Sequence, residues 1–380
     1  MHFRFNEEQL ELGRAARRFL EIESTTDKLR ASIGSDELYD AGLYQRIAEE
    51  LGWLALLIPE EYDGIGLGAV DLMPILEEMG RSLYRGPFFS TVCLGVNALL
   101  LGGSEAQKEE LLPRIASGEE TLTLAYTEPH GRHGVEAIET RFEERGEEFI
   151  LHGVKRYVLD GMSADRVIVA ARASGSVGDE GVRLFLVRGD AEGLKRTRLP
   201  TLDISRNEAE LVFEGVKVGR EAILGEELEG SVLLEAILDR ARAALAVDQV
   251  GGAERCLDMA VAYSLERKQF GRPIGSFQAV KHKAADMLWK VESARSIAYA
   301  ANVAAASNDT LLLRELASSA KAYASDAYFF CASENIQIHG GVGFTWEYDP
   351  HFYFKRAKAS EELFGHADFH RERVARAMGL

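Results

Sequence analysis

Hydrophobic and polar positions divide the chain into three stretches, and the first of these is helical. Between residues 6 and 118 apolar side chains recur at helical spacing, as at Leu12, Ala16, Phe19 and Leu20, and this pattern predicts amphipathic helices. The loop at residues 58–68 is rich in Pro and Gly and is expected to be irregular. Further helices are predicted over Asp36–Leu51, Val70–Arg81, Val92–Leu101 and Glu105–Ala116.

The second stretch consists of short β-rich runs separated by turn residues such as Arg145-Gly146 and Gly189-Asp190. Six or more strands at this spacing indicate an antiparallel sandwich or barrel. The predicted strands are Thr121–Tyr126, Val135–Glu143, Glu148–His152, Arg166–Ala171, Arg183–Val187 and Ala209–Phe213.

The third stretch is helical again, with long helices and short turns. Such helices favour an antiparallel four-helix bundle. We therefore predict an α+β multidomain fold with an N-terminal helical domain (1–120), a middle antiparallel β-sandwich or barrel (121–225) and a C-terminal four-helix bundle (226–380). The predicted helices of the bundle are Gly230–Lys268, Ser276–Ala306, Asp309–Ile338 and Phe369–Ala377.

The composition and net charge of the chain argue against some kinds of binding partner. With 46% hydrophobic and 28% charged residues, the chain is typical of a globular protein, and its net charge of -17 argues against nucleic acid or an anionic membrane as a general partner. No apolar run approaches the roughly 18 residues of a membrane span. Cys93, Cys256 and Cys331 lack metal-ligand spacing, so we expect no metal site and reduced thiols in a cytoplasmic protein.

The corner at residues 266–278, E-R-K-Q-F-G-R-P-I-G-S-F-Q, separates two of the long helices. Gly271 and Pro273 end one helix and allow a sharp reversal. Arg267 and Phe270 lie in this corner, and these residue types bind phosphate bidentately and pack on a nucleotide base. Two interpretations follow: a solvated helix–helix turn, or a site for an anionic, partly aromatic ligand.

Five motifs in order carry a resemblance to the acyl-CoA dehydrogenases over nearly the whole chain. The resemblance implies FAD bound between subunits, oxidation of an acyl-CoA to an enoyl-CoA, and an electron-transfer flavoprotein or similar acceptor. It also implies a homo- or hetero-oligomer built as a dimer of dimers. The motifs are I-P-E-E-Y-D-G-I-G-L-G at Ile58, A-Y-T-E-P at Ala125, K-R-Y-V-L-D-G at Lys155, R-K-Q-F-G-R-P-I-G-S-F-Q at Arg267 and Q-I-H-G-G-V-G-F-T-W-E-Y at Gln337.

The residues that the family uses for the nucleotide part of FAD are present. Arg267 and Phe270 match the positions that hold the pyrophosphate and the adenine. Gln337, Gly340 and Gly341 match a loop that passes close to the same moiety, where Gly permits close backbone approach. The resemblance implies that these groups act across a subunit interface, on a flavin whose ring lies in the neighbouring chain.

The positions that resemble the flavin-ring site fit the family less well. Thr127 matches the family Thr, and Tyr157 can stack near the ring. His133 stands where the family has Ser, and Leu159 lacks the hydroxyl expected near flavin N5. The alternative interpretation is that this wall only packs.

The catalytic base is the sharpest departure from the family, and it stays unassigned. The two positions at which members carry the base Glu are occupied by Phe364 and Ala241. Asp248 is a further candidate, since it lies seven residues beyond Ala241 on the same helical face and about 10 Å along the axis. Glu361 and Glu362 precede Phe364 and are expected to be surface or ion-paired acids.

These departures resemble a bacterial branch that includes partner subunits of mixed-chain acyl-CoA dehydrogenases, as in steroid side-chain breakdown. Groups that would act across the interface are kept, whereas groups that would act within the chain are altered. Three hypotheses follow: an acyl-CoA dehydrogenase of fatty acid or steroid degradation with a displaced base, a non-catalytic FAD-supporting partner subunit of a heteromeric enzyme, and a flavin monooxygenase-like member of the family.

Overall fold

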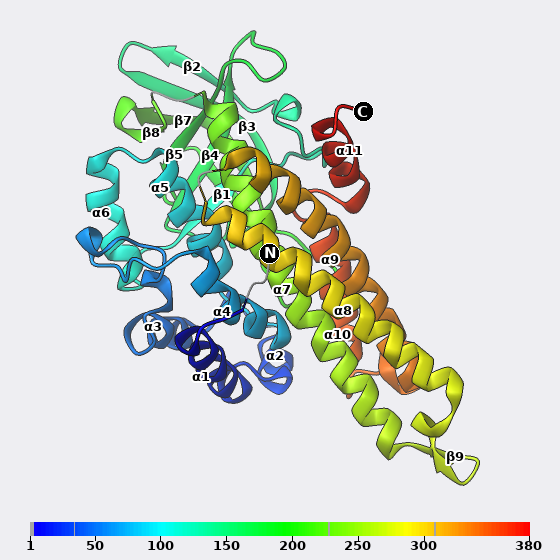
Figure 1. Ribbon diagram of the computed structural model, residues 1–380. Coiled ribbons are helices and arrows are strands. Elements are labelled where there is room, and N and C mark those ends of the chain that lie inside the picture. The colour runs from blue at the N-terminus through cyan, green and yellow to red at the C-terminus, as the bar shows by residue number, and fades with distance from the viewer. Residues whose placement is uncertain (1–3, 34, 227–228, 308) are drawn as a thin grey trace.

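The computed structural model describes residues 4–33, 35–226, 229–307 and 309–380. A helical region, a β-sheet and a bundle of long helices follow one another along the chain (Figure 1). This order confirms the predicted α+β fold class. No helix among the described residues has both the length and the apolar character needed to cross a membrane.

The N-terminal region is built from short helices with defined caps. Asn6 and Gln9 form a reciprocal capping box at the first helix. The helix predicted from Asp36 begins only at Ala41, because the Asp40 carboxylate accepts a hydrogen bond from the Leu43 N–H and acts as the N-cap. The elements are α1 (Glu7–Glu23), α2 (Thr26–Ser32), α3 (Ala41–Glu49), η1 (Trp53–Ala55), η2 (Glu60–Tyr62), α4 (Ala69–Arg81), the π-helix η3 (Phe89–Val96), α5 (Asn97–Gly102) and α6 (Glu105–Ala116).

The strands form one sheet in the order β6-β7-β3-β2-β4-β5-β8, with β1 paired to β4. Most pairs are antiparallel, but β1 and β2 both pair with β4 in parallel, so the sheet is mixed and not wholly antiparallel as predicted. The strand predicted from Val135 begins at Arg141, because Val135–Ala137 is a 3-10 turn. The strands are β1 (Leu122–Ala125), β2 (Arg141–Arg145), β3 (Glu148–Leu159), β4 (Arg166–Ala173), β5 (Val182–Arg188), β6 (Leu194–Arg198), β7 (Glu208–Gly219) and β8 (Ile223–Leu224).

Three long helices and a shorter fourth make the bundle, and they run between the sheet and a distant tip (Figure 1). The N-terminal region packs closely on the bundle, because a Cβ added at Gly80 would lie 1.9 Å from the Asp248 carbonyl oxygen and one at Gly251 would lie 1.8 Å from that of Glu77. The helices are α7 (Gly230–Glu266), α8 (Gln278–Ala305), α9 (Thr310–His339) and α10 (Pro350–Glu362), followed by α11 (Ala367–Ala377).

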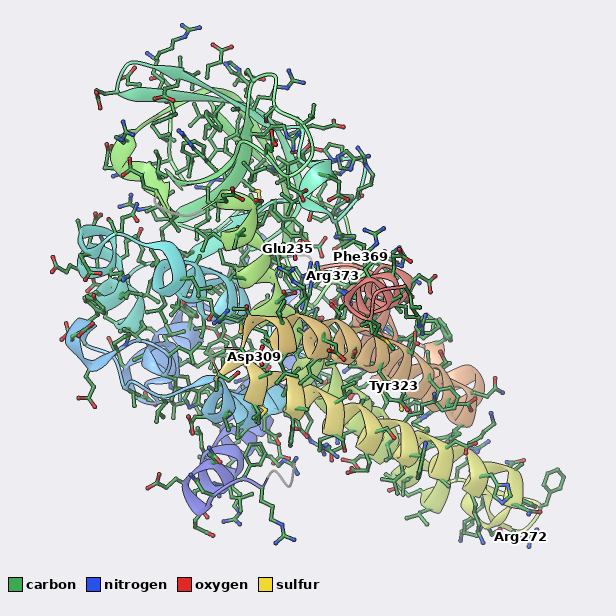
Figure 2. The ribbon with its side chains drawn as sticks, turned by 45° about the horizontal axis from the view of Figure 1, so that its top comes forward. Glu235, Arg272, Asp309, Tyr323, Phe369 and Arg373 are labelled. Carbon is green, nitrogen blue, oxygen red and sulfur yellow. The ribbon has the colours of Figure 1, made fainter. Side chains whose placement is uncertain are left out.

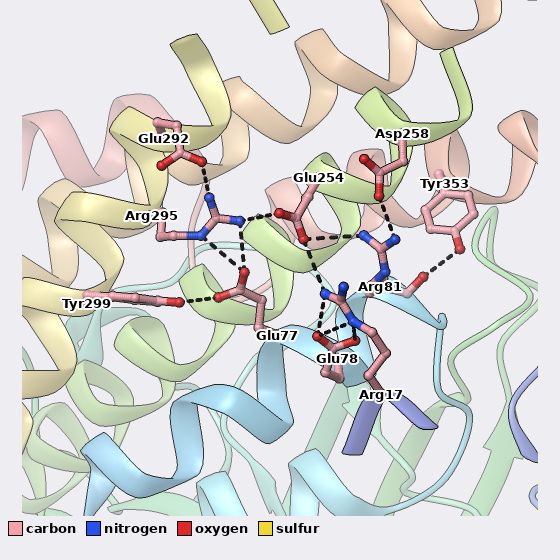
Figure 3. A network of polar contacts seen from close by, with 10 residues as sticks. All are labelled: Arg17, Glu77, Glu78, Arg81, Glu254, Asp258, Glu292, Arg295, Tyr299 and Tyr353. Atoms are coloured by element: carbon pink, nitrogen blue, oxygen red, sulfur yellow. Dashed lines mark hydrogen bonds and ion pairs between the residues drawn. The ribbon is translucent and has the colours of Figure 1, made fainter. Parts of the chain in front are cut away.

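Ion pairs also join the first helices to the bundle (Figure 3). Arg295 on α8 lies 2.9 Å from Glu77 on α4 and 2.9 Å from Glu254 on α7. Arg17 on α1 lies 2.7 Å from Glu78. These pairs connect four helices that are far apart in sequence, so they help to hold the helical region in place beside the bundle.

Candidate functional site

The corner predicted to hold an anion lies at the tip of the bundle. After α7, β9 (Lys268–Gln269) and β10 (Arg272–Pro273) form a small antiparallel hairpin, followed by the 3-10 turn η6 (Ile274–Ser276). Phe270 and Gly271 make the turn, with φ of +51° and +78°. The Phe270 side chain is 92% exposed. A left-handed backbone is costly for an aromatic residue, and here no burial of the ring within the chain offsets that cost.

The Gly340 loop lies beside this corner. The His339 ring at the end of α9 stacks on Tyr263 in the last turn of α7, with ring centroids 4.2 Å apart, and Arg267 follows Tyr263 by one turn. Gly340 has φ of +66°, and a Cβ added at Gly340 or Gly341 would meet nothing within 4 Å. The loop, which continues as the 3-10 helix η7 (Gly340–Phe344), therefore presents bare backbone to its surroundings.

Arg267 and Gln337 are also exposed at this tip. The Arg267 backbone is fixed, because its N–H donates to the Tyr263 carbonyl at 2.9 Å and its carbonyl accepts from the Ile274 N–H at 2.8 Å. Within the described part of the chain its guanidinium has no ion-pair partner. Five of the seven predicted cofactor residues are thus brought together at one exposed end.

The other two, Thr127 and Tyr157, line a cavity of about 510 Å³ between the sheet and α10. His133 also lines this cavity and packs on Phe369, with centroids 5.9 Å apart. Figure 2 shows Arg272 at the tip of the bundle and Phe369 beside the half of the bundle nearer the sheet. The cavity and the hairpin of one chain therefore lie far apart.

Strand pairing and a buried ion pair shape the cavity wall. Tyr157 has φ of +60° at an irregularity in the pairing of β3 with β7, and its side chain is 43% exposed. The Lys155 ammonium is fully buried and donates to Glu128 at 2.7 Å and to the Tyr126 carbonyl at 3.1 Å. Burial alone would raise the pKa of the Glu128 carboxyl, but Lys155 and two backbone N–H groups lower it. These bonds from Lys155 hold the turn around Thr127 against β3.

Phe364, at the usual position of the catalytic base, is 4% exposed. Its ring lies between Phe89 and Tyr126, with centroid distances of 6.0 Å and 6.4 Å and interplanar angles of 20° and 21°. Such stacking adds to the burial of an aromatic side chain. This position therefore presents a packed ring to the cavity and no carboxylate.

Two cationic side chains hold the backbone of the Phe364 loop. The Arg242 Nε donates to the Phe364 carbonyl at 3.3 Å, and the Lys321 Nζ donates to the carbonyls of Gly365 and Glu361 at 3.0 Å and 3.1 Å. Burial lowers the pKa of Lys321 to about 7. The loop has φ of +58° at Phe364 and +107° at Gly365, and these bonds fix it in that conformation.

Neither of the other two positions considered for the base offers a free carboxylate to the cavity. Ala241 is fully buried in the same apolar cluster as Phe364. Asp248 lines a separate cavity of about 30 Å³, where its carboxylate accepts a hydrogen bond from Arg206 at 2.8 Å. Asp248 is thus ion-paired and outside the larger cavity.

Two carboxylates do line the larger cavity within the described residues, Glu208 and Glu362. Glu362 is at the exposed rim, 3.9 Å from the Lys358 ammonium. Glu208 is 7% exposed at the start of β7. Sequence reasoning missed Glu208, because its inward position depends on the pairing of β7 with β3, which are distant in sequence.

Comparisons with known proteins agree with this architecture. Models of the acyl-CoA dehydrogenase N-terminal, middle and C-terminal domains match residues 6–119, 123–216 and 229–379. The acyl-CoA dehydrogenase IpdE2 of Mycolicibacterium smegmatis is 31% identical over 360 residues, 95% of each chain. Butyryl-CoA dehydrogenase from Megasphaera elsdenii has the same fold, with a TM-score of 0.92, 28% identity and 100% of both chains covered. The ChsE4-ChsE5 complex from Mycobacterium tuberculosis gives a TM-score of 0.89 and 26% identity, covering 100% of this chain and 99% of that one.

The chain belongs to the acyl-CoA dehydrogenase family, whose members are FAD-dependent oxidoreductases acting on CH–CH bonds. The two groups of residues described above fit different parts of that cofactor. An exposed guanidinium, an exposed aromatic ring and bare glycine backbone suit a pyrophosphate and an adenine. The apolar cavity beside Thr127 and Tyr157 suits a flat ring system. The two groups lie far apart within one chain.

Proposed function

We propose that this chain acts in acyl-CoA dehydrogenation as one subunit of a heteromeric enzyme, and that its bundle tip holds the nucleotide part of a flavin whose ring lies in another chain. The observation that carries the proposal is the contrast between the two sites. All five residues proposed to bind the nucleotide are exposed at the tip, whereas the base position of the cavity is filled by the buried Phe364 ring.

Each group at the tip has a role that its chemistry suits. Arg267 would bind the pyrophosphate through its planar guanidinium, and Phe270 would pack on the adenine. Gly340 and Gly341 would let the backbone approach the same moiety, since no Cβ stands in the way. Gln337 is exposed beside them and would add a side-chain hydrogen bond.

The family reaction removes an α-proton and a β-hydride from the acyl-CoA thioester. Bound FAD supplies the hydride acceptor for that reaction. A proton acceptor must lie beside the substrate α-carbon, and neither Phe364 nor Ala241 can take a proton. We infer that the catalytic carboxylate belongs to the second chain, with an electron-transfer flavoprotein or similar acceptor taking the electrons. The similarity to a two-chain complex in this fold supports that inference.

The experiment is to purify the chain alone and together with a second acyl-CoA dehydrogenase chain encoded beside it, and to record the visible spectrum and native mass. We expect the chain alone to retain little FAD through purification, and the mixed complex to be yellow and to be bleached by an acyl-CoA. A yellow homotetramer that an acyl-CoA reduces without any second chain would refute the heteromeric role. Oxygen consumption by the reduced flavin would point instead to monooxygenase-like chemistry.

A further inference from the structure

Glu208 faces the larger cavity from the sheet. It opens β7, where its carbonyl accepts from the Leu199 N–H at 2.9 Å, and it lies directly opposite Leu159 in the β3–β7 pairing. Residues directly opposite in an antiparallel pair carry their side chains on the same face. Leu159 is the position at which the family resemblance expects the flavin ring, so the Glu208 carboxyl is adjacent to that wall.

This carboxyl is buried without a partner. Its residue is 7% exposed, and across the described ranges no hydrogen bond or ion pair reaches the carboxylate. Arg206 is the nearby cation, but it donates to Asp248 at 2.8 Å. Burial, reinforced by the negative charges of Asp203 and Asp160 and opposed by Arg206, raises the pKa of Glu208 to about 7.

Other titratable or charged groups face the cavity from β3, from α10 and from the loop after β1, and none contacts Glu208 within the structure as described. Lys358 is paired with Glu361 at 2.8 Å. Burial and neighbouring cations lower the pKa of His133 to about 4, so its ring is neutral at physiological pH. These groups are Tyr126, His133, Arg156, Tyr157, Lys358 and Glu362.

We propose that Glu208 couples occupancy of this cavity to a proton: an uncharged flat ring, such as oxidised flavin, binds when the carboxyl is protonated and is rejected when it is ionised. The inference rests on the proposed function in one respect: the flavin ring is taken as the ligand because the family binds FAD. A ring that fills the cavity removes the remaining water from the carboxyl. An ionised carboxylate without a counter-charge cannot lose that water cheaply, whereas a carboxylic acid is neutral and can donate a hydrogen bond to the ring.

The sign of the coupling follows from linkage. Below pH 7 Glu208 is already protonated in the empty cavity, so the ring binds without uptake of a proton. Above pH 7 each binding event must take up a proton, so the affinity falls by up to about tenfold per pH unit.

Riboflavin is the probe, because it carries the ring without the pyrophosphate and adenine that the tip would hold. Its dissociation constant for the purified chain is measured by fluorescence quenching at about pH 6 and about pH 8.5, and we expect it to rise about tenfold or more for the unmodified protein. Glu208→Gln should bind equally at both pH values. Glu362→Gln, the matched control in the other carboxylate of the cavity, should keep the pH dependence.

The proposal is overturned if the unmodified chain shows no pH dependence, if Glu208→Gln retains it, or if no saturable binding occurs at about pH 6. Riboflavin has no pyrophosphate or adenine for the tip to bind. If the proposed function is wrong, FAD binding therefore departs from expectation while riboflavin binding does not. If the Glu208 proposal is wrong, the pH dependence of riboflavin binding departs from expectation.

Discussion

Two phenylalanines with the same unusual backbone show how differently the two ends of the bundle use an aromatic ring. Phe270 at the tip has φ of +51° and is 92% exposed, and Phe364 beside the cavity has φ of +58° and is 4% exposed. The strain at Phe364 is offset by stacking and by bonds from Arg242 and Lys321 to its loop. Among the described residues Phe270 makes only an edge contact with Phe277, with ring centroids 6.1 Å apart, and its ring stays exposed.

A strained and exposed aromatic residue is best explained by a contact made outside the chain. The tip is therefore interpreted as a surface kept for a ligand or a second subunit. The cavity wall, where a family base would stand, is interpreted as a region in which packing has replaced chemistry.

The largest expected effect on stability is at Phe364. Phe364→Ala should lower the free energy of unfolding by about 3–5 kcal/mol, because a buried ring is removed from between two others. Phe364→Leu, which keeps most of the apolar volume, should cost about 1.5 kcal/mol or less. Chemical denaturation at constant pH measures both. A loss below about 1 kcal/mol for the Ala variant would show that the stack contributes little.

The next effect concerns Glu208 and depends on pH. The pKa of Glu208 is raised to about 7 in the folded protein. The stability of the protein with a protonated Glu208 is therefore fully present below the pKa of the unfolded chain and is lost as pH rises through about 7. Glu208→Gln should therefore match the unmodified protein near pH 4.5 and exceed it by about 3 kcal/mol near pH 8. Thermal unfolding across this range measures the difference. A constant difference at all pH values would contradict the raised pKa.

The smallest effect on stability is expected at Phe270. Phe270→Ala should change the free energy of unfolding by no more than about 0.5 kcal/mol, since the ring is exposed. Its FAD dissociation constant should nevertheless rise about three- to tenfold, the loss expected for one aromatic contact. Equilibrium dialysis of FAD against the mixed complex measures this change. A marked loss of stability with unchanged FAD affinity would mean that the ring has only a local structural role.

Much of the fold could be predicted from periodicity because local patterns determine it. The α6 helix was predicted to the residue, and α7 and α9 ended within two residues of their predicted bounds. α10 was missed, since its aromatic first turn, P-H-F-Y-F, does not show helical spacing. β6 was missed because its L-K-R-T-R sequence is polar and pairs only with β7 at the sheet edge.

The candidate site divides in the same way. Arg267 and Phe270 belong to one continuous motif, so sequence was enough to group them. The packing of Phe364 between Phe89 and Tyr126 joins three segments far apart in the chain, and no local pattern encodes it. Glu208 could not be recognised from the sequence for the same reason, since only the pairing of β7 with β3 places it facing the cavity.

The FAD content of a mixed complex decides whether this tip holds a flavin that belongs to another chain. Arg267→Ala is combined with the unmodified second chain, and Arg272→Ala serves as the control, because its guanidinium lies 4.2 Å from the Phe277 ring. We expect the Arg267→Ala complex to lose most of its flavin absorbance and the Arg272→Ala complex to keep it. Full FAD content in the Arg267→Ala complex would show that this tip does not hold the flavin.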